Sequence, residues 1–445
     1  MENSTLVPKR ILESLMSSLS AGVVPRLGAP YVAIGREDEV NALLRDLSAV
    51  SEGGSSMRFI IGNYGSGKSF LMQLMRGYAL ERGYVTCDCD LSPERRFSGG
   101  HGSGLATYRE LVRNMATKTS ADGGALPVII SKWLSSLQSE TAAEGNDPSS
   151  PGFAGLVDKK VYTVLSELEG SVGGFDFAHV LSEYYRAVTT DGDALRSDCL
   201  RWLRGEYTTR TEARKDIGAG SVIDDDNWYD YIKLWAQFVR LCGYKGLIVF
   251  IDECVNLYKI TNRIGRENNY EKILSMFNDT LQGRAKGLAI ILGGTPKFLE
   301  DTRRGLFSYE ALRSRLADSR FVSSGSFTDL LGPVIRLKKL SANETLALIA
   351  RVTKLHRQYY GWEPRVTEED MVSFYNEISA RIGADVRITP REIIRDYLSV
   401  LNILLQNPEV NFSQVIGTAV SGGACAAAAE TDSPDDGLTL EDIEI

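Results

Sequence analysis

The sequence GNYGSGKS occupies residues 62–69, between an apolar run at residues 57–61 and a segment with helical periodicity. Apolar residues recur after it at helical spacing until Gly83 ends the pattern. This is a complete G-x-x-x-x-G-K-S phosphate loop in a strand–loop–helix context. Its glycines let backbone N–H groups turn inward, and the following helix directs its positive end to the same point. The sequence therefore predicts a nucleoside triphosphate site, which a plain glycine-rich turn would not require.

Nine residues of this segment are candidates for phosphate contact: Gly62, Asn63, Tyr64, Gly65, Ser66, Gly67, Lys68, Ser69 and Phe70. Lys68 would reach the outer phosphates, and Ser69 would be a ligand of Mg²⁺. A second motif, LIVFIDE at residues 247–253, begins with the continuous apolar run of a strand buried on both faces. Its two carboxylates fit a Walker B motif, in which Asp252 would hold the Mg²⁺ shell and Glu253 would polarise the attacking water. ATP and Mg²⁺ are the expected cofactors.

The composition is that of a globular protein with two or three domains: 445 residues, of which 43% are hydrophobic and 24% charged. No run of about 18 apolar residues suggests a membrane span, and the N-terminus does not resemble a secretory signal. Six scattered cysteines and three histidines favour reduced thiols in the cytoplasm over a metal site. The net charge of −8 comes from an acidic C-terminal end and neither supports nor excludes nucleic-acid binding.

The order of strand and helix patterns predicts an α/β fold with a parallel sheet, helices on both faces, a large helical insertion and an α-helical lid. We expect an N-terminal segment and the first half of the core at residues 1–90, a helical insertion at 91–225 and the second half of the core at 226–338. A helical lid follows at 339–416, and a flexible acidic tail at 417–445. Within the lid, Ser341 is followed three residues later by Glu, and Thr389 is followed directly by Pro at the first helical position, which predicts two capped helices.

Several motifs together resemble an AAA+ ATPase of the origin-recognition branch, and more specifically the ATP-binding protein family of bacterial phage-exclusion (BREX) systems. IGREDE at residues 34–39 resembles the start of origin-recognition AAA+ modules. The closer resemblance rests on five segments: GNYGSGKSF at 62–70, GYKGLIVFIDE at 243–253, GGTPKFL at 293–299, SYEALRSRL at 308–316 and TPREIIRDYL at 389–398. These segments spread over roughly residues 30–410. The resemblance implies an ATPase within an antiphage defence cassette that includes DNA methylation and helicase-like components.

The AAA+ resemblance also implies residues that sense or complete the nucleotide site. Thr295 ends an apolar run and fits the sensor 1 position near the γ-phosphate, although a strand-end turn would also suit Thr-Pro. Arg315, with Arg313 as second choice, is a candidate to reach the γ-phosphate of a neighbouring subunit. A solvated basic helix face explains either arginine equally well. Arg391, just after a helix N-cap, fits the sensor 2 position, with Arg395 one turn later as its rival or as an ion-pair partner of Glu392.

Two functions fit these motifs. The first is an ATPase that regulates or remodels a defence complex associated with DNA, and the second is an ATP-gated scaffold that turns over little until a partner supplies an arginine. A small-molecule kinase is disfavoured because such enzymes usually lack the paired carboxylates. Expected partners are other defence-system proteins, DNA and, in the presence of nucleotide, further copies of the chain, but no membrane. Candidate DNA contacts, which plain surface charge would also explain, are Arg201, Arg204, Arg210, Arg214 and Lys215.

Overall fold

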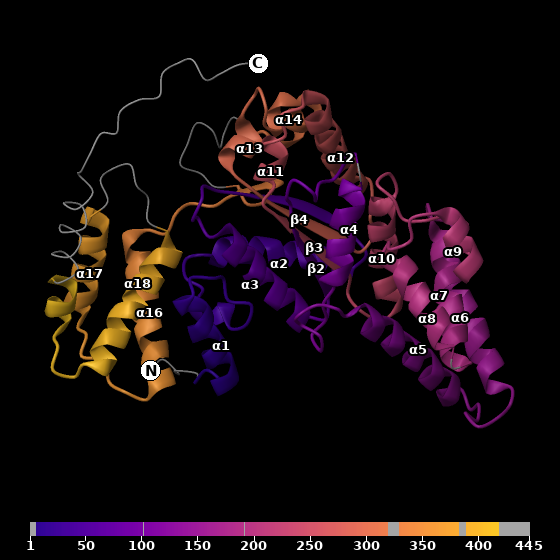
Figure 1. Cartoon of the computed structure of the whole chain (residues 1–445), viewed down its shortest axis with the longest axis horizontal. Coiled ribbons are helices and arrows are strands. Elements are labelled where there is room, and N and C mark those ends of the chain that lie inside the picture. Colours follow the sequence, from indigo (N-terminus) through magenta and orange to yellow (C-terminus); the bar gives the residue numbers. More distant parts are fainter. Residues whose placement is uncertain (1–5, 101, 191, 319–328, 382–388, 418–445) are drawn as a thin grey trace, which may run out of the picture. The chain divides into compact units, whose positions relative to one another are not determined.

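The computed structural model describes residues 6–100, 102–190, 192–318, 329–381 and 389–417. Its centre is a five-stranded parallel sheet flanked by helices, which confirms the predicted α/β fold of the P-loop type (Figure 1). The strands are β1 (Ser56–Ile61), β2 (Val85–Asp90), β3 (Leu247–Asp252), β4 (Leu288–Gly294) and β5 (Val334–Arg336). They lie in the order β2-β3-β4-β1-β5. β4 therefore separates β1, which leads into the phosphate loop, from β3, which carries the acidic motif.

Side chains of the sheet alternate between two apolar cores, as the pleat of a strand requires. On one face, Ile60, Phe250 and Ile291 pack with α2 (Glu37–Ser51) and α3 (Lys68–Glu81). On the other face, alternate strand positions such as Phe59 and Val249 join a larger core with helices of the second half of the chain. These include α10 (Trp228–Leu241) and α12 (Arg263–Leu281). Because both faces are covered, a central strand such as β3 can be apolar along most of its length, as seen in LIVFI.

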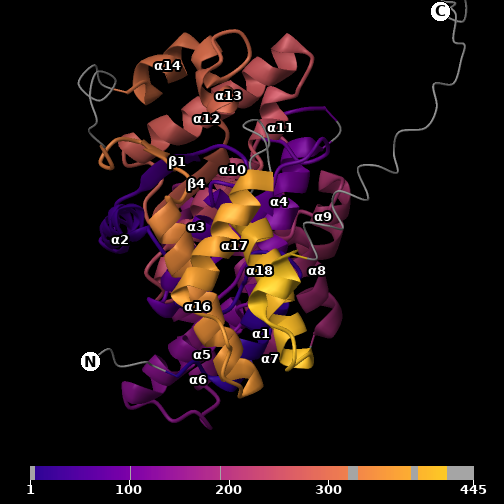
Figure 2. The same cartoon turned by 90° about the vertical axis from the view of Figure 1, so that its left-hand side faces the viewer.

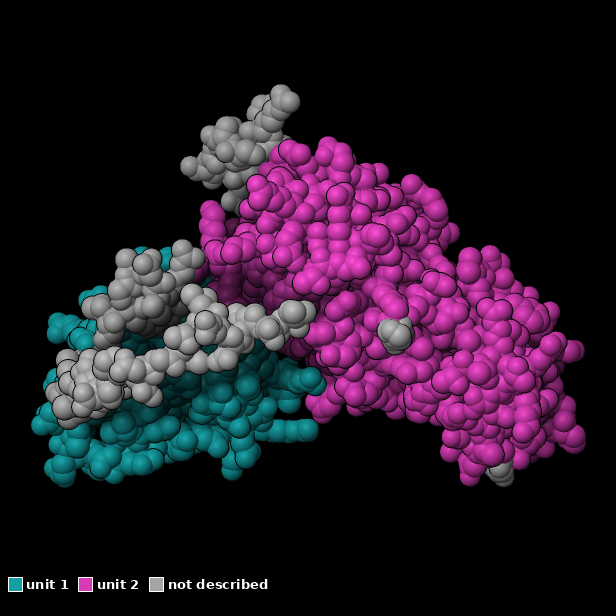
Figure 3. All heavy atoms as spheres, turned by 45° about the horizontal axis from the view of Figure 1, so that its top comes forward, with its two compact units in different colours: residues 1–34, 340–445 teal, residues 35–339 magenta. Residues whose placement is uncertain are grey.

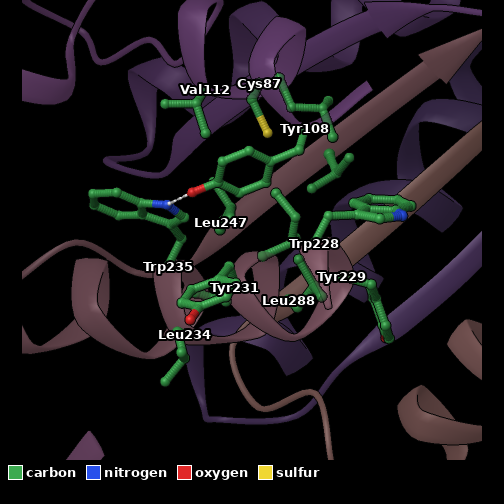
Figure 4. Close-up of a cluster of buried hydrophobic side chains, with 14 of the residues drawn as sticks. Cys87, Tyr108, Val112, Trp228, Tyr229, Tyr231, Leu234, Trp235, Leu247 and Leu288 are labelled. Atoms are coloured by element: carbon green, nitrogen blue, oxygen red, sulfur yellow. Dashed lines mark hydrogen bonds between the residues drawn. The ribbon is translucent and has the colours of Figure 1, made fainter. Parts of the chain in front are cut away.

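Between β2 and α10, the described residues form six helices, of which the first packs against β2 and the others extend away from the sheet (Figure 1). They are α4 (Ser103–Arg113), α5 (Leu126–Ala143), α6 (Phe153–Glu169), α7 (Gly174–Thr189), α8 (Asp193–Leu203) and α9 (Arg210–Ile217). A buried aromatic cluster anchors them, in which Trp235 of α10 donates its Nε1–H to the Tyr108 hydroxyl at 3.0 Å (Figure 4). The same hydroxyl donates to Leu203 O at 2.7 Å. The insertion thus shares the core of the sheet.

Short elements follow the two central strands and shape the edge at which those strands end. α11 (Val255–Tyr258) comes directly after β3, and α13 (Pro296–Glu300) after β4. The 3₁₀ helix η2 (Leu306–Ser308) and α14 (Glu310–Leu316) continue from α13. Leu299, Leu306 and Leu312 are buried in the larger core, which fixes these short elements despite their length.

The chain divides into two compact units, residues 35–339 and residues 1–34 with 340–445 (Figure 3). In the second unit, α1 (Lys9–Ser20) packs against α16 (Ala342–Tyr360) and α18 (Pro390–Gln406). α17 (Glu368–Arg381) packs against α16 (Figure 2). α16 and α18 begin with complete capping boxes at Ser341 and Thr389, which confirms both predicted caps. The predicted acidic tail lies, from residue 418 on, outside the described residues.

Two expectations about chemistry and environment can be checked in this fold. Five cysteines lie among the described residues, at positions 87, 89, 199, 242 and 254, and all five are free and buried. Burial raises the pKa of the Cys87, Cys242 and Cys254 thiols well above the usual range, which keeps them protonated. Among the described residues, no helix combines the length and the apolar character that crossing a membrane requires.

Candidate nucleotide-binding site

The phosphate loop leaves the sheet after β1 and enters α3 at Lys68. Gly62 N–H donates to Gly294 O at 3.1 Å, so pairing with β4 continues into the first loop residue. Gly65 and Gly67 have φ angles of 75° and 89°, a conformation that side chains disfavour. A Cβ on Gly62 would lie 2.2 Å from Ser66 Oγ. The glycine positions of the motif are thus required by the folded shape of the loop itself.

Lys68 is half-buried and folds back over the loop. Its Nζ donates to the carbonyl oxygens of Gly62 and Asn63 at 2.9 and 3.1 Å. Burial lowers the pKa of Lys68, and the carboxylates of Asp252 and Glu253 oppose that shift. The ammonium therefore lies inside the turn of the loop and within electrostatic range of both acidic residues.

Ser69 and Asp252 lie in contact although 183 positions separate them in the sequence. Ser69 Oγ donates to Asp252 Oδ2 at 2.5 Å, and Asp252 Oδ1 accepts from Glu253 N–H at 2.8 Å. Gly293 of β4 leaves the space that Asp252 occupies, since a Cβ there would lie 2.3 Å from Oδ1. A hydroxyl and a carboxylate are oxygen donors of the kind that Mg²⁺ takes beside phosphate oxygens and water. The structure therefore brings the loop and the strand tip together.

Glu253 is exposed, and its backbone has an unusual conformation. Its φ is 55°, and among the described residues it is the only non-glycine residue with positive φ. Such a conformation costs about 1–3 kcal/mol and clusters at functional sites. The turn is fixed because Cys254 N–H donates to Gly293 O at 3.0 Å, which resumes the pairing with β4.

A further acidic residue lies at this edge, and the sequence analysis did not single it out. Asp90 ends β2 in register with Asp252 of β3. Loss of hydration raises the pKa of Asp90, and the charges of Asp252, Asp88 and Glu253 raise it further, against the opposing effect of Arg95. Negative charge is therefore concentrated where a cation is expected. The signal in the sequence was that two neighbouring strands each end in an acidic residue.

Thr295 follows β4 and is half-buried. Its Oγ1 accepts a hydrogen bond from Phe298 N–H at 3.3 Å, which caps α13. The side chain thus fills the strand-end role that the sequence left open as an alternative. Because the hydroxyl uses only an acceptor position for the cap, its O–H remains able to donate.

The predicted arginines lie in two different settings. Arg313 and Arg315 are exposed on α14, where Arg313 lies 3.8 Å from Glu310 and Arg315 donates to Ala311 O at 2.7 Å. Both of these interactions stay within α14. Arg391 is at the start of α18, in the other compact unit, where its side chain lies beside Gly22. None of these observations assigns the three arginines a role at the phosphate loop.

The remaining loop residues differ in exposure. Tyr64 is 79% exposed at the tip of the loop, and Asn63 is exposed beside it. Ser66 is buried, and its Oγ has no hydrogen-bond partner among the described residues. Phe70 is half-buried in the first turn of α3.

One residue of the IGREDE segment also contacts the loop. The Arg36 guanidinium donates to Ser66 O at 2.9 Å and to Lys338 O at 2.7 Å. The sequence analysis noted the motif that contains Arg36 but assigned this residue no role.

Comparison with known proteins adds one match. A family model described as BREX system ATP-binding protein BrxC/D matches residues 7–420 of the chain. A search of curated proteins finds no match. The matched segment includes the phosphate loop, the β3 tip, α14 and the start of α18.

Proposed function

Since the chain belongs to the family of BREX system ATP-binding proteins BrxC/D, which gives it an ATP-binding role in phage defence, we propose that it is a Mg²⁺-dependent ATPase. The observation that carries this proposal is the 2.5 Å contact between Ser69 Oγ and Asp252 Oδ2, beside the Lys68 ammonium. A hydroxyl, a carboxylate and a lysine in this order along one edge match what a magnesium–triphosphate unit needs.

Each side chain of the site has a proposed task. Backbone N–H groups and the Lys68 ammonium would bind the phosphates, while Ser69 and Asp252 would hold Mg²⁺, which neutralises phosphate charge when bound. Glu253 would orient a water and accept its proton, and its exposed position beyond the strand tip leaves room for that water. Thr295 would donate its O–H toward the γ-phosphate or the water while its oxygen caps α13.

We further propose an AAA+-type arrangement in which a second copy of the chain completes the site. The position of β4 between the two motif strands supports this arrangement. So does the exposure of Arg313 and Arg315 on α14, since an arginine that acts on a neighbour's nucleotide must be accessible. Arg391 would report the nucleotide to the unit that contains α18.

Arg313 and Arg315 are also compatible with a second function. Because the interactions of Arg313 and Arg315 stay within α14, a single chain could bind ATP and turn it over very slowly, as an ATP-gated scaffold. The two functions differ in how the rate depends on protein concentration. Hydrolysis per chain that rises as the purified protein is concentrated supports self-assembly, whereas a rate that rises only with another component of the system supports the scaffold.

The central test is a pair of glutamate substitutions. Glu253→Gln should retain Mg²⁺·ATP binding and lose most hydrolysis, because the amide cannot accept the proton from water. Glu52→Gln, an exposed glutamate at the end of α2, is the matched control and should leave both unchanged. Binding is measured by calorimetry and hydrolysis by phosphate release. Hydrolysis by Glu253→Gln at the wild-type rate would show that another group activates the water.

Membership of the family implies other components of the system as partners, and DNA remains a proposal. The Arg201 guanidinium already has partners within the chain, since it lies 3.2 Å from both Asp198 and Glu212 and stacks on Tyr207. Arg204 lies 3.9 Å from Glu206.

Three basic residues of α9 are exposed and are better placed for DNA contact: Arg210, Arg214 and Lys215. We therefore restrict the proposed DNA contact to α9. A titration of DNA binding against salt tests it, because each phosphate contact steepens the salt dependence, and replacing these three residues should flatten it.

A further inference from the structure

Arg36 is a buried arginine whose position the ATPase proposal does not use. It is 6% exposed and precedes the first turn of α2. Its Nη2 donates to both Ser66 O, at 2.9 Å, and Lys338 O, at 2.7 Å, and its Nη1 donates to Glu39 Oε1 at 3.3 Å. All four residues belong to the unit of residues 35–339. We infer that Arg36 is a positioning residue that holds the phosphate loop in its triphosphate-binding shape and links that shape to the chain segment at Lys338.

The effect on the loop follows from the geometry of one peptide unit. Ser66 C=O and Gly67 N–H belong to the same planar trans peptide and point in opposite directions. Since Arg36 holds the carbonyl on its own side, the Gly67 N–H is held facing away from Arg36. Amide groups turned inward are what a phosphate loop offers to an anion. Arg36 therefore orders this amide before any ligand arrives, which reduces the cost of binding.

Neighbouring residues leave this peptide little other support. Gly67 has a φ of 89°, a region that glycine enters and leaves easily. Ser66 Oγ is buried without a hydrogen-bond partner among the described residues, so it does not hold the turn. A buried charge is also weak support for stability on its own, because desolvation offsets what its contacts gain. Orientation of the phosphate loop therefore explains a buried arginine at position 36 better than a contribution to stability does.

The hydrogen bond from Arg36 to Lys338 O extends the effect of Arg36 beyond the phosphate loop. The chain passes between the two compact units at residues 34–35 and at residues 339–340. In the sequence, Arg36 closely follows the first crossing and Lys338 precedes the second. The Arg36 guanidinium therefore connects the phosphate loop to chain segments next to both crossings. A ligand that tightens the Ser66–Gly67 peptide would therefore also tighten the segment at Lys338. This inference deepens the proposed function and rests on ATP binding at the loop.

The test compares Arg36 with Arg58, another buried arginine of the same unit. Arg58 bonds to Asp46 and to Leu331 O and does not hydrogen-bond to the phosphate loop. We would measure Mg²⁺·ATP affinity, the urea midpoint without nucleotide, and amide exchange of residues 62–69 and 335–340. The variants are Arg36→Met, Arg36→Lys and the control Arg58→Lys. Arg36→Lys keeps the charge but loses the planar guanidinium, whose Nη2 bonds both carbonyls while Nη1 bonds Glu39.

Arg36→Met should weaken ATP binding about tenfold to hundredfold, since hydrogen bonds from a charged group contribute about 1.5–3 kcal/mol. It should also speed amide exchange in both segments, and Arg36→Lys should fall between it and wild type. Arg58→Lys should lower the urea midpoint but leave the Mg²⁺·ATP affinity at its wild-type value.

Wild-type affinity in Arg36→Met, or an equal loss of affinity in Arg58→Lys, would overturn the inference. If Arg36→Met does not fold, wild-type affinity and exchange in Arg36→Lys would overturn it instead. Failure of the wild-type protein to bind ATP would instead refute the proposed function.

Discussion

Gly293 offers the sharpest test of the site, because a single methyl group added there meets the acidic strand tip. Gly293→Ala would place Cβ 2.3 Å from Asp252 Oδ1, 3.1 Å from Asp252 Cγ and 3.2 Å from Met72 Sδ. The φ of Gly293 is not in the region that favours glycine, so the effect of the substitution comes from space alone. Met72 is flexible and can move aside. The Asp252 carboxylate must therefore rotate away.

That rotation has a calculable cost. It breaks the hydrogen bonds from Ser69 Oγ and Glu253 N–H, at 2.5 and 2.8 Å, each of which contributes about 1.5–3 kcal/mol when the acceptor is charged. Asp252 is half-buried, so water recovers part of this energy. We expect a net loss of about 2–4 kcal/mol in the free energy of unfolding. Mg²⁺-dependent ATP binding should fall with it, because the proposed metal ligand has moved.

Urea denaturation followed by tryptophan fluorescence measures the first effect. Four of the five tryptophans lie in residues 35–339, so the signal reports mainly on the unit that contains the site. Gly77→Ala is the matched control: Gly77 lies in α3, and apart from its chain neighbours and the local helix backbone no atom of the described residues lies within 4 Å of the position its Cβ would take. That control should gain about 0.5–1 kcal/mol, as a glycine replaced within a helix does. Wild-type stability and wild-type Mg²⁺ dependence in Gly293→Ala would refute the assignment of Asp252.

Substitutions at three other residues have defined outcomes. Thr295→Ala should cost about 1 kcal/mol by removing the α13 cap, while Thr295→Ser should restore both stability and ATP hydrolysis; hydrolysis unchanged in Thr295→Ala would exclude the sensor role. Tyr108→Phe should cost about 2–4 kcal/mol, because Trp235 Nε1 and Leu203 O would lose their buried partner; a near-neutral urea midpoint would show that the aromatic cluster relaxes. Burial lowers the pKa of His356, whose Nδ1 accepts from Trp362 Nε1 at 2.9 Å. Its contribution is therefore present above the unfolded value of about 6.5 and is lost as the pH falls through the folded value. Trp362 fluorescence should show acid destabilisation that His356→Gln reduces, and an equal pH dependence in both proteins would contradict this.

The parts of the fold that follow from local pattern could be predicted from the sequence. Apolar runs identified β1, β3 and β4, and glycine punctuation separated them from helices. The contact between Ser69 and Asp252 could also be predicted, because parallel strands that end at one edge bring their following residues together. The caps at Ser341 and Thr389 depend on residues three positions apart, and the structure confirms both. Each of these features is encoded over short range or by a known strand order.

Features that depend on distant or weak patterns could not be predicted. α8 and α9 were not identified, and α9 is short and largely polar, so its apolar spacing is faint. The packing of α1 with α16 and α18 joins opposite ends of the chain, and no local pattern specifies that partnership. The positive φ of Glu253 opposes the preference of its residue type, so only the completed fold can reveal it. Arg36 was in view as part of a motif, but its two carbonyl partners lie 30 and 302 positions away.

The charges at the sheet edge bear on how a triphosphate could enter the site. Asp90, Asp252 and Glu253 place negative charge beside the loop, and the pKa of Asp90 is raised by loss of hydration and by those neighbours. A triphosphate without metal would add further negative charge to this edge, where like charges repel strongly at short range. Lys68 is one ammonium, and it already lies within electrostatic range of two of these carboxylates. A divalent cation shared by Ser69, Asp252 and the phosphates would convert the repulsion into attraction. The arrangement therefore supports the proposal that Mg²⁺ and the triphosphate bind as one unit, and it explains why moving Asp252 alone, as Gly293→Ala does, should impair both.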